Sequence, residues 1–194
     1  VHAMKRKRMP FHGILYAGIM VTGQGPRVLE FNCRMGDPET QPLMMRLQTD
    51  LLDLLEAAVE NRLDEFEGKI VWDPRPAVCV VLAAKGYPGV VDKNHTITGL
   101  YEAAKLKDVQ IFHGATRFDS RNIVTDGGRV LSVTALGDDM IAARAKAYEA
   151  VSLIKFSGMQ YRTDIGLKAL EPLPFPIKEI TPEVAEDLVA EPEV

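Results

Sequence analysis

The chain has 194 residues, of which 46% are hydrophobic and 26% are charged, as in ordinary globular proteins of one domain or two small ones. No apolar run approaches the ~20 residues that a membrane span needs, so we expect no insertion into a membrane. The net charge is −4, but residues 171–194 carry seven acids and one lysine, which leaves 22 basic and 20 acidic residues elsewhere. A nearly neutral body argues against general nucleic-acid binding, and the basic run KRKR at 5–8 is interpreted as a solvated helix end.

The cysteines and the N-terminus bear on the cellular compartment. Cys33 and Cys79, the only two cysteines, both lie in apolar strand-like runs. We therefore predict buried free thiols in a reducing compartment rather than a disulfide. No signal peptide is recognised, because glycines and a proline interrupt the apolar segment after the basic run. The expected location is the cytoplasm.

The first predicted elements are two strands joined by a tight turn. Residues 14–22 (ILYAGIMVT) and 27–33 (RVLEFNC) have strand composition, and GQGP between them predicts a hairpin. From 42 to 60 the leucines recur at spacings of three and four, which predicts one amphipathic helix with Pro42 in its first turn. GDPET is then the short connection between strand and helix.

Residues 61–76 lose this periodicity and form a plausible boundary. The apolar run at 77–84 (AVCVVLAA) predicts a strand buried on both faces. KGYPG after it predicts a turn in which Tyr87 and Pro88 pack, with a loop beside the substrate as the alternative. Further strands are predicted at 109–118 and 128–137.

A second helix is predicted over about 140–155, with Asp138 and Asp139 available to cap its start. Its expected buried face comprises Ile141, Ala145, Tyr148 and Val151. The proline-rich residues from 171 onward are expected to form mostly a mobile extension.

The stretch EFNCRMGDPETQ at 30–41 carries most of the polar chemistry. Strand alternation places Glu30, Asn32 and Arg34 on one face, and Glu30 and Asn32 lie about 6.6 Å apart along the strand. A carboxylate and an amide oxygen suit Mg²⁺ or Mn²⁺, with water and nucleotide phosphates completing the shell. Arg34 adds a cation suited to phosphate, and the following helix start also favours anions. The opposite face carries Leu29, Phe31 and Cys33.

The spacing alone does not decide between this site and a plainer interpretation. The spacing E-x-N often occurs by chance in strands. The same residues also fit the polar, solvent-facing side of a sheet, with Asp37 as a turn residue. For the GDPE loop, a turn-forming role is as good an account as substrate binding.

A longer string is more specific. The segment GILYAGIMVTGQGPRVLEFNCRMGDPETQPLMMRLQTDLLDLLEAAVENRL resembles the closing section of the ATP-grasp domain of the phosphoribosylamine–glycine ligases. The later segments AAKGYPG, IFHGATRF, TDGGRVLSVTALG and YRTDIG agree with that family in order. The resemblance covers roughly residues 10–170.

The resemblance implies an α+β fold, with the C-terminal part of an ATP-grasp lobe at 1–68, a small mostly antiparallel α+β domain at 69–170 and an acidic tail at 171–194. It also implies a ligase of de novo purine synthesis that uses ATP, glycine and phosphoribosylamine, and proceeds through glycyl phosphate to glycinamide ribonucleotide, ADP and phosphate. No nucleic-acid or membrane partner is expected.

In that family the residues matching Glu30 and Asn32 hold a divalent metal, Mg²⁺ or Mn²⁺, that bridges the ATP phosphates. Arg34 is assigned to phosphate or acyl-phosphate stabilisation, and the loop formed by Gly36, Asp37, Pro38 and Glu39 is placed beside glycine and phosphoribosylamine.

Two departures qualify this assignment. The strand at 14–22 lacks the further metal carboxylate of many ATP-grasp enzymes. The lobe that grips ATP is also missing, and the chain starts at Val1 rather than Met, so we expect a fragment that is inactive alone. The alternatives are another ATP-grasp carboxylate–amine ligase or carboxylase, and a non-catalytic binding module.

Two later motifs have plain structural interpretations. His113, in an apolar run, is expected to be a structural histidine, because no nucleophile pattern accompanies it. Arg162 and Asp164 are expected to form an ordinary ion pair, with a role in orienting substrate as the alternative.

Overall fold

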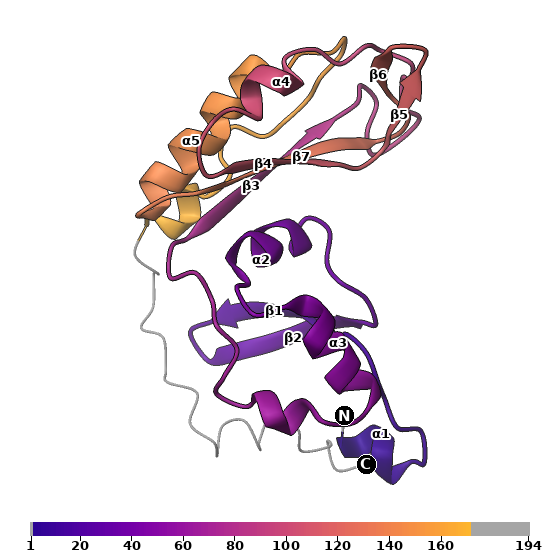
Figure 1. Cartoon of the computed structure of the whole chain (residues 1–194), viewed down its shortest axis with the longest axis vertical. Helices are drawn as coiled ribbons and strands as arrows, with labels where there is room; N and C mark the ends of the chain where they lie inside the picture. The colour runs from indigo at the N-terminus through magenta and orange to yellow at the C-terminus, as the bar shows by residue number, and fades with distance from the viewer. Residues whose placement is uncertain (1, 172–194) are drawn as a thin grey trace.

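The computed structural model describes residues 2–171, so the predictions for the tail beyond 171 lie outside the described residues (Figure 1). The first part of the chain contains α1 (His2–Arg6), β1 (Tyr16–Thr22), β2 (Gly25–Asn32), α2 (Thr40–Arg46), α3 (Leu51–Val59) and the 3₁₀ helix η1 (Leu63–Phe66). The second part contains β3 (Ala77–Ala83), α4 (Leu100–Ala103), β4 (Val109–His113), β5 (Thr116–Asp119), β6 (Asn122–Thr125), β7 (Arg129–Leu136), α5 (Met140–Leu153) and the 3₁₀ helix η2 (Leu167–Ala169).

The predicted hairpin is confirmed. β1 and β2 pair antiparallel, with Tyr16 opposite Asn32 and Gly18 opposite Glu30. The register shifts between Gly18 and Ile19, an irregularity that locally re-aims the side chains of a strand.

The single helix predicted over 42–60 is wrong, because α2 and α3 are separate. Leu47 ends α2 in an extended conformation and forms an isolated bridge with Trp72. Asp50 then begins α3 by accepting a hydrogen bond of 2.8 Å from the Leu52 amide. The leucine spacing persists across the break, so periodicity alone missed the cap inside it. Pro42 lies in the first turn of α2, as predicted.

The second part is built on a three-stranded antiparallel sheet in the order β3–β7–β4. Figure 1 shows α5 lying along one face of this sheet, and α2 packs against β3 and β7 from the side of the hairpin. The strand buried on both faces is therefore the central β7, in which Val130 to Leu136 are all buried. For the strand at 77–84 that prediction is wrong: β3 is an edge strand, and Cys79 and Val81 on one face are only half-buried.

The strand predicted over 109–118 is two strands. β4 pairs with β7 and ends at His113. β5 pairs with β6 in a separate hairpin. The sequence pattern predicts no strand at β6, because its four residues are too few to show a period.

The start of α5 is confirmed, since the Asp139 carboxylate accepts a hydrogen bond of 2.7 Å from the Ala142 amide. Its predicted face is confirmed at Val151, which is buried, and wrong at Ile141, which is 65% exposed, and at Ala145, which is also exposed. The buried face consists of Ala143, Ala147, Ala150 and Val151. The small alanine side chains let the helix approach the sheet closely. A prediction based on large apolar residues such as Ile141 does not detect a buried face made of alanines.

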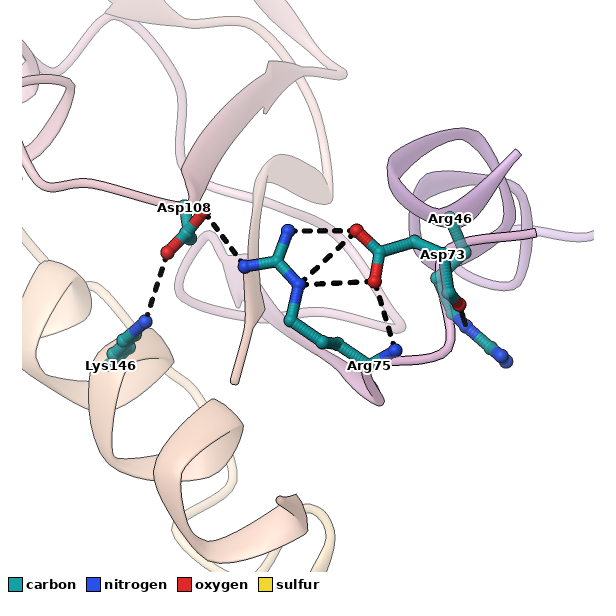
Figure 2. A network of polar contacts seen from close by, with 5 residues as sticks. All are labelled: Arg46, Asp73, Arg75, Asp108 and Lys146. Atoms are coloured by element: carbon teal, nitrogen blue, oxygen red, sulfur yellow. Dashed lines mark hydrogen bonds and ion pairs between the residues drawn. The ribbon is translucent and has the colours of Figure 1, made fainter. Parts of the chain in front are cut away.

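A network of ion pairs joins the two parts (Figure 2). Arg75 holds the Asp73 carboxylate through Nε at 3.0 Å and Nη2 at 2.7 Å, and its Nη1 reaches Asp108 at 3.1 Å. Lys146 of α5 binds the same Asp108 at 3.1 Å, and Arg46 of α2 donates to the Asp73 carbonyl at 3.1 Å. The segment before β3 is thereby tied to α2 on one side and to α5 on the other.

The predicted α+β fold with mostly antiparallel strands is confirmed. Among residues 2–171, no helix combines the length and the hydropathy that a transmembrane segment requires.

Candidate functional site

The polar face of the β1–β2 hairpin brings the two predicted metal ligands together. The Asn32 amide nitrogen donates to Glu30 Oε1 at 3.0 Å, so both side chains lie side by side on one face. Gly18 faces Glu30 across the hairpin, and a Cβ at that position would come within 3.2 Å of Glu30 Cγ. A glycine there leaves room for the Glu30 side chain.

Two further groups, Tyr16 and Glu39, extend this face. The Tyr16 hydroxyl donates to Glu39 Oε1 at 3.0 Å, and Tyr16 is the cross-strand partner of Asn32. The hydrogen bond to Glu39 and the negative charges of Glu39 and Glu30 raise the pKa of Tyr16 above its ordinary value. Sequence reasoning missed Tyr16, although its place in the first predicted strand, opposite Asn32 in a hairpin, was a usable signal.

The GDPE loop folds back over the hairpin at Gly36. The Thr40 amide donates to the Gly36 carbonyl at 3.1 Å and closes the turn. A Cβ on the buried Gly36 would come within 2.4 Å of Glu39 Oε2, so only glycine lets the Glu39 side chain lie there. Gly36 therefore both closes the turn and leaves room for the Glu39 side chain.

Arg34 lies just beyond the end of β2 and is exposed. Its Nη1 donates to the neighbouring Met35 carbonyl at 2.9 Å. Its positive charge lies close enough to Tyr16 to counter, in part, the rise in the pKa of that phenol. The guanidinium thus adds positive charge at the end of the strand that carries Glu30.

The donor atoms of Glu30 and Asn32 fit a hard cation. Both are oxygen donors once the Asn32 amide turns its Oδ1 toward Glu30, which requires only a rotation of the terminal amide. Within residues 2–171, no group of three or more His, Cys, Asp and Glu side chains is placed to hold a metal ion. A cation here would therefore take its remaining ligands from water or from a bound anion.

The GDPE loop is also fastened to the C-terminal sheet. Arg129, at the start of β7, donates from Nη1 to the Asp37 carbonyl, and the same nitrogen lies 3.2 Å from Asp37 Oδ2. Its Nε donates to the Tyr87 hydroxyl at 2.7 Å. A Cβ on Gly128 would come within 2.4 Å of the Tyr87 ring, so glycine at that position permits this packing.

The remaining side-chain predictions have mixed outcomes. Both cysteines are free, but the prediction that both are buried is wrong, because Cys33 is exposed and Cys79 is half-buried. The ion pair between Arg162 and Asp164 is confirmed at 2.6 Å. His113 is exposed, and its Nδ1 lies 2.9 Å from the Thr116 hydroxyl.

Two family models match the chain. Residues 1–40 match the ATP-grasp (A) domain of phosphoribosylglycinamide synthetase, and residues 77–168 match its C domain. The phosphoribosylamine–glycine ligase of Rhodopirellula baltica is 53% identical over 170 residues, which is 88% of this chain and 39% of that protein. The ligase of Pseudomonas aeruginosa is 48% identical over 171 residues, again 88% of this chain and 39% of the relative.

Solved structures agree with these matches. The crystal structure of the Thermotoga maritima phosphoribosylamine–glycine ligase aligns with a TM-score of 0.65 at 33% identity, over 84% of this chain and 39% of that one. The biotin carboxylase domain of the Hydrogenobacter thermophilus 2-oxoglutarate carboxylase aligns with a TM-score of 0.56 at 13% identity, over 96% of this chain and 42% of that one, which shows a shared fold alone.

The chain thus spans about two fifths of the length of the curated relatives it matches, 39% in each of the two cited above. The two family models, the curated relatives and the Thermotoga maritima structure together show that the chain belongs to the phosphoribosylglycinamide synthetase family, the phosphoribosylamine–glycine ligases of the ATP-grasp superfamily.

Proposed function

We propose that this chain supplies the metal-binding face and the substrate loop of an ATP-dependent ligase that joins glycine to phosphoribosylamine in purine biosynthesis. The relatives' names support this assignment, and the observation that carries it is the pairing of Glu30 with Asn32 on the hairpin face. Since the chain spans only part of those relatives, the complete activity is proposed for the complete protein.

In the proposed reaction the glycine carboxylate attacks the γ-phosphorus of ATP, which gives glycyl phosphate and ADP. The amine of phosphoribosylamine then attacks the acyl carbon, phosphate leaves, and the amine loses a proton. Glu30 and Asn32 would hold Mg²⁺ or Mn²⁺, and such a cation neutralises charge on the phosphates and fixes their orientation.

The other residues of this face have distinct proposed roles. Arg34 would stabilise the transferring phosphoryl group or the acyl phosphate, because its guanidinium can bind two oxygens at once. The loop from Gly36 to Glu39 would border the glycine and phosphoribosylamine sites. Tyr16 would keep Glu39 in place through its hydroxyl, which donates to that carboxylate at 3.0 Å.

The test is ADP release by the complete gene product, measured with glycine and phosphoribosylamine present together and singly. ADP release should require both substrates, and Glu30→Gln should lower kcat/KM at least about 100-fold, which corresponds to about 2.7 kcal/mol of transition-state stabilisation. Asn32→Asp should keep Mn²⁺ binding, measured by electron paramagnetic resonance, whereas Asn32→Leu should weaken it.

Arg27→Gln is the matched control, because Arg27 lies on the same strand near the hairpin turn, where it contacts Gln24 at 3.1 Å. It should leave both Mn²⁺ binding and turnover unchanged. ADP release that depends on bicarbonate instead of glycine would contradict the proposal and indicate a carboxylase. Full activity in Glu30→Gln would contradict the metal assignment.

A further inference from the structure

The helix α2 links the GDPE loop to the joint between the two parts of the chain. Glu39, the last residue of the loop, is the N-cap of α2, and its carbonyl accepts from the Leu43 amide at 3.3 Å. At the other end, Arg46 is the last residue of this seven-residue helix. A helix rises 1.5 Å per residue, so α2 is a rod of only about 10 Å, and a movement at one end also moves the other.

Apolar burial alone does not fix the position of α2. None of its seven residues, all of which the structure describes, is buried. The helix lies against β3 and β7, but the buried core consists mainly of residues from that sheet and α5. Polar contacts at the two ends of α2 therefore contribute strongly to holding the helix in place.

Both ends of α2 have a polar anchor. At the N-terminal end, Arg129 of β7 holds Asp37 of the GDPE loop, with 3.2 Å between Nη1 and Oδ2. At the C-terminal end, the Asp73 amide donates to the Arg46 carbonyl at 2.7 Å, and Arg46 Nε donates to the Asp73 carbonyl at 3.1 Å. The C-terminal end of the helix is thus bound to Asp73.

Arg75 connects Asp73 to the C-terminal sheet (Figure 2). Its Nε and Nη2 bind the Asp73 carboxylate at 3.0 and 2.7 Å, whereas its Nη1 donates to Asp108 at 3.1 Å. One planar guanidinium therefore joins two carboxylates, which a lysine ammonium lacks the geometry to do. The side chains of Asp73 and Asp108 are 12% and 17% exposed, so solvent screens these ion pairs less than it screens pairs on the open surface.

Asp108 has a fixed place beside the sheet, directly before β4. Its carbonyl accepts from the Leu136 amide at 2.9 Å, and Lys146 of α5 donates to its carboxylate at 3.1 Å. Its φ of 62° lies in the left-handed region, which residues other than glycine adopt rarely. The series of contacts from α2 thus ends on β7 and α5, which belong to the buried core.

The loop end of α2 reaches the proposed metal face. Glu39 accepts the hydrogen bond from Tyr16 at 3.0 Å, and Tyr16 is the cross-strand partner of Asn32. A displacement of α2 would therefore move Glu39 away from Tyr16 or move the hairpin with it. Reactions between bound groups are sensitive to displacements of about 1 Å, even when their cause lies far from the reacting atoms.

From these contacts we propose that Arg75 is a positioning residue. Through Asp73 and α2 it sets the place of Glu39, and with it that of the GDPE loop, relative to the C-terminal sheet. The importance of this placement for ligation rests on the proposed function. Because Arg75 acts through Asp73 and α2, it is not a catalytic residue.

The first experiment measures the placement of the two parts without turnover. In the complete gene product, with its other cysteines replaced by serine, nitroxides at Glu56→Cys on α3 and Ile141→Cys on α5 report a distance by double electron–electron resonance, and both positions are exposed. Arg75→Gln should at least about double the width of the distance distribution, because α2 loses its connection to Asp108. An unchanged distribution would overturn the proposal.

Arg62→Gln is the matched control. Arg62 also joins two carboxylates, with Nε 2.8 Å from Glu60 and Nη1 2.8 Å from Glu65, but all three residues belong to the first part of the chain. This variant should keep the wild-type distance distribution and turnover. A change as large as that of Arg75→Gln would show that the loss of any such ion pair has this effect, and it would overturn the assignment.

The second experiment separates kcat from KM. Arg75→Gln should lower kcat at least about tenfold and leave the KM for ATP and the affinity for Mn²⁺ within about twofold, because Glu30 and Asn32 keep their places on the hairpin. Asp108→Asn should also lower kcat, and the double variant should lose no more than Arg75→Gln alone, because both residues act through one contact. An ordinary stabilising ion pair would lower only the unfolding midpoint. Unchanged kcat of the folded enzyme, or additive losses in the double variant, would therefore overturn the positioning role.

The outcomes separate this inference from the proposed function. A wider distance distribution in Arg75→Gln, in a protein without glycine-dependent ADP release, would uphold the placement by Arg75 and contradict the proposed function. A wider distribution with unchanged kcat in an active ligase would uphold the proposed function and overturn the positioning role. Circular dichroism confirms that each variant is folded before the variants are compared.

Discussion

The two parts of the chain differ in how they bury their apolar residues. The C-terminal part has a continuous core that joins β3, β7 and α5 and includes Val80, Leu82 and Val133, all fully buried. In the part before β3, Ala57 is the only buried hydrophobic residue among those described. Large side chains of the hairpin and α3 are exposed instead: Leu29 is 65% exposed, Phe31 62% and Val59 76%.

The core and the proposed metal face therefore occupy different places in the molecule. The hairpin carries Glu30, Asn32 and Tyr16, yet among the described residues its Leu29 and Phe31 side chains are more than 60% exposed. An exposed apolar surface of this kind is typical of a surface that contacts another domain or protein, and not of one that faces only solvent. The cooperative stability of the described residues should therefore come from the C-terminal part, which the following predictions test from the largest effect to the smallest.

The largest effect is expected from truncating a core leucine. Leu82→Ala should lower the free energy of unfolding by about 3 kcal/mol, because it removes buried methyl groups and leaves a cavity. Leu29→Ala should change it by less than about 0.5 kcal/mol, since that side chain is already solvated. Urea denaturation followed by circular dichroism measures both values.

Equal losses in the two variants would contradict the division between the parts. They would mean that the hairpin residues are covered in solution. A Leu→Ala change on the exposed face of α3, Leu52→Ala, serves as a second control, because Leu52 is 61% exposed.

The same division explains which features could be predicted from sequence. Features that depend on a few neighbouring residues were predicted correctly. The turn sequence GQGP predicted the hairpin, Asp139 predicted the start of α5, and the E-x-N spacing predicted that Glu30 and Asn32 lie side by side. Each of these depends on neighbours in the chain, so tertiary context does not alter it.

The failures are the features that tertiary contacts decide. The break between α2 and α3 depends on Leu47 pairing with Trp72, and the buried face of α5 depends on the close approach of alanines to the sheet. The contact of Arg129 with Asp37 joins residues 92 positions apart, and no spacing rule reveals it.

The next prediction concerns the joint between the parts at acid pH. The hydrogen bonds from Arg75 lower the pKa of Asp73 to about 2, and those from Lys146 and Arg75 lower the pKa of Asp108. Because the folded-state pKa of Asp73 lies below its ordinary value, its stabilisation is present above about pH 4 and is lost as the pH falls toward 2.

Fluorescence of Trp72, the only tryptophan and the neighbour of Asp73, should report this loss between pH 4 and pH 2. Asp73→Asn should remove the transition from that range and lower the unfolding midpoint at pH 7, by less than Leu82→Ala does. Asp119→Asn, in an exposed pair 3.9 Å from Arg117, should keep the wild-type profile. A wild-type profile in Asp73→Asn would contradict the assignment.

The two cysteines should react with a thiol reagent at different rates, because Cys33 lies in the exposed hairpin region and Cys79 lies in the C-terminal sheet. Burial raises the pKa of the Cys79 thiol, whereas Cys33 is exposed at the end of the hairpin. The thiolate is the reactive form, so at pH 8 a disulfide reagent should label Cys33 at least roughly tenfold faster than Cys79. Cys33→Ser should leave only the slow phase, and a remaining fast phase would show that Cys79 is accessible.

The smallest effect compares the helix cap in each part. Asp139 caps α5 and Asp50 caps α3 through similar hydrogen bonds of 2.7 and 2.8 Å. Asp139→Ala should lower the global free energy of unfolding by about 1 kcal/mol, because α5 packs on the core. Asp50→Ala should instead speed amide exchange within α3 and change the global transition by only a few tenths of a kcal/mol, because α3 contributes one buried residue, Ala57. Equal shifts of the global transition would mean that both parts unfold as one unit, and the ion pairs of Arg75 would then be the structural reason.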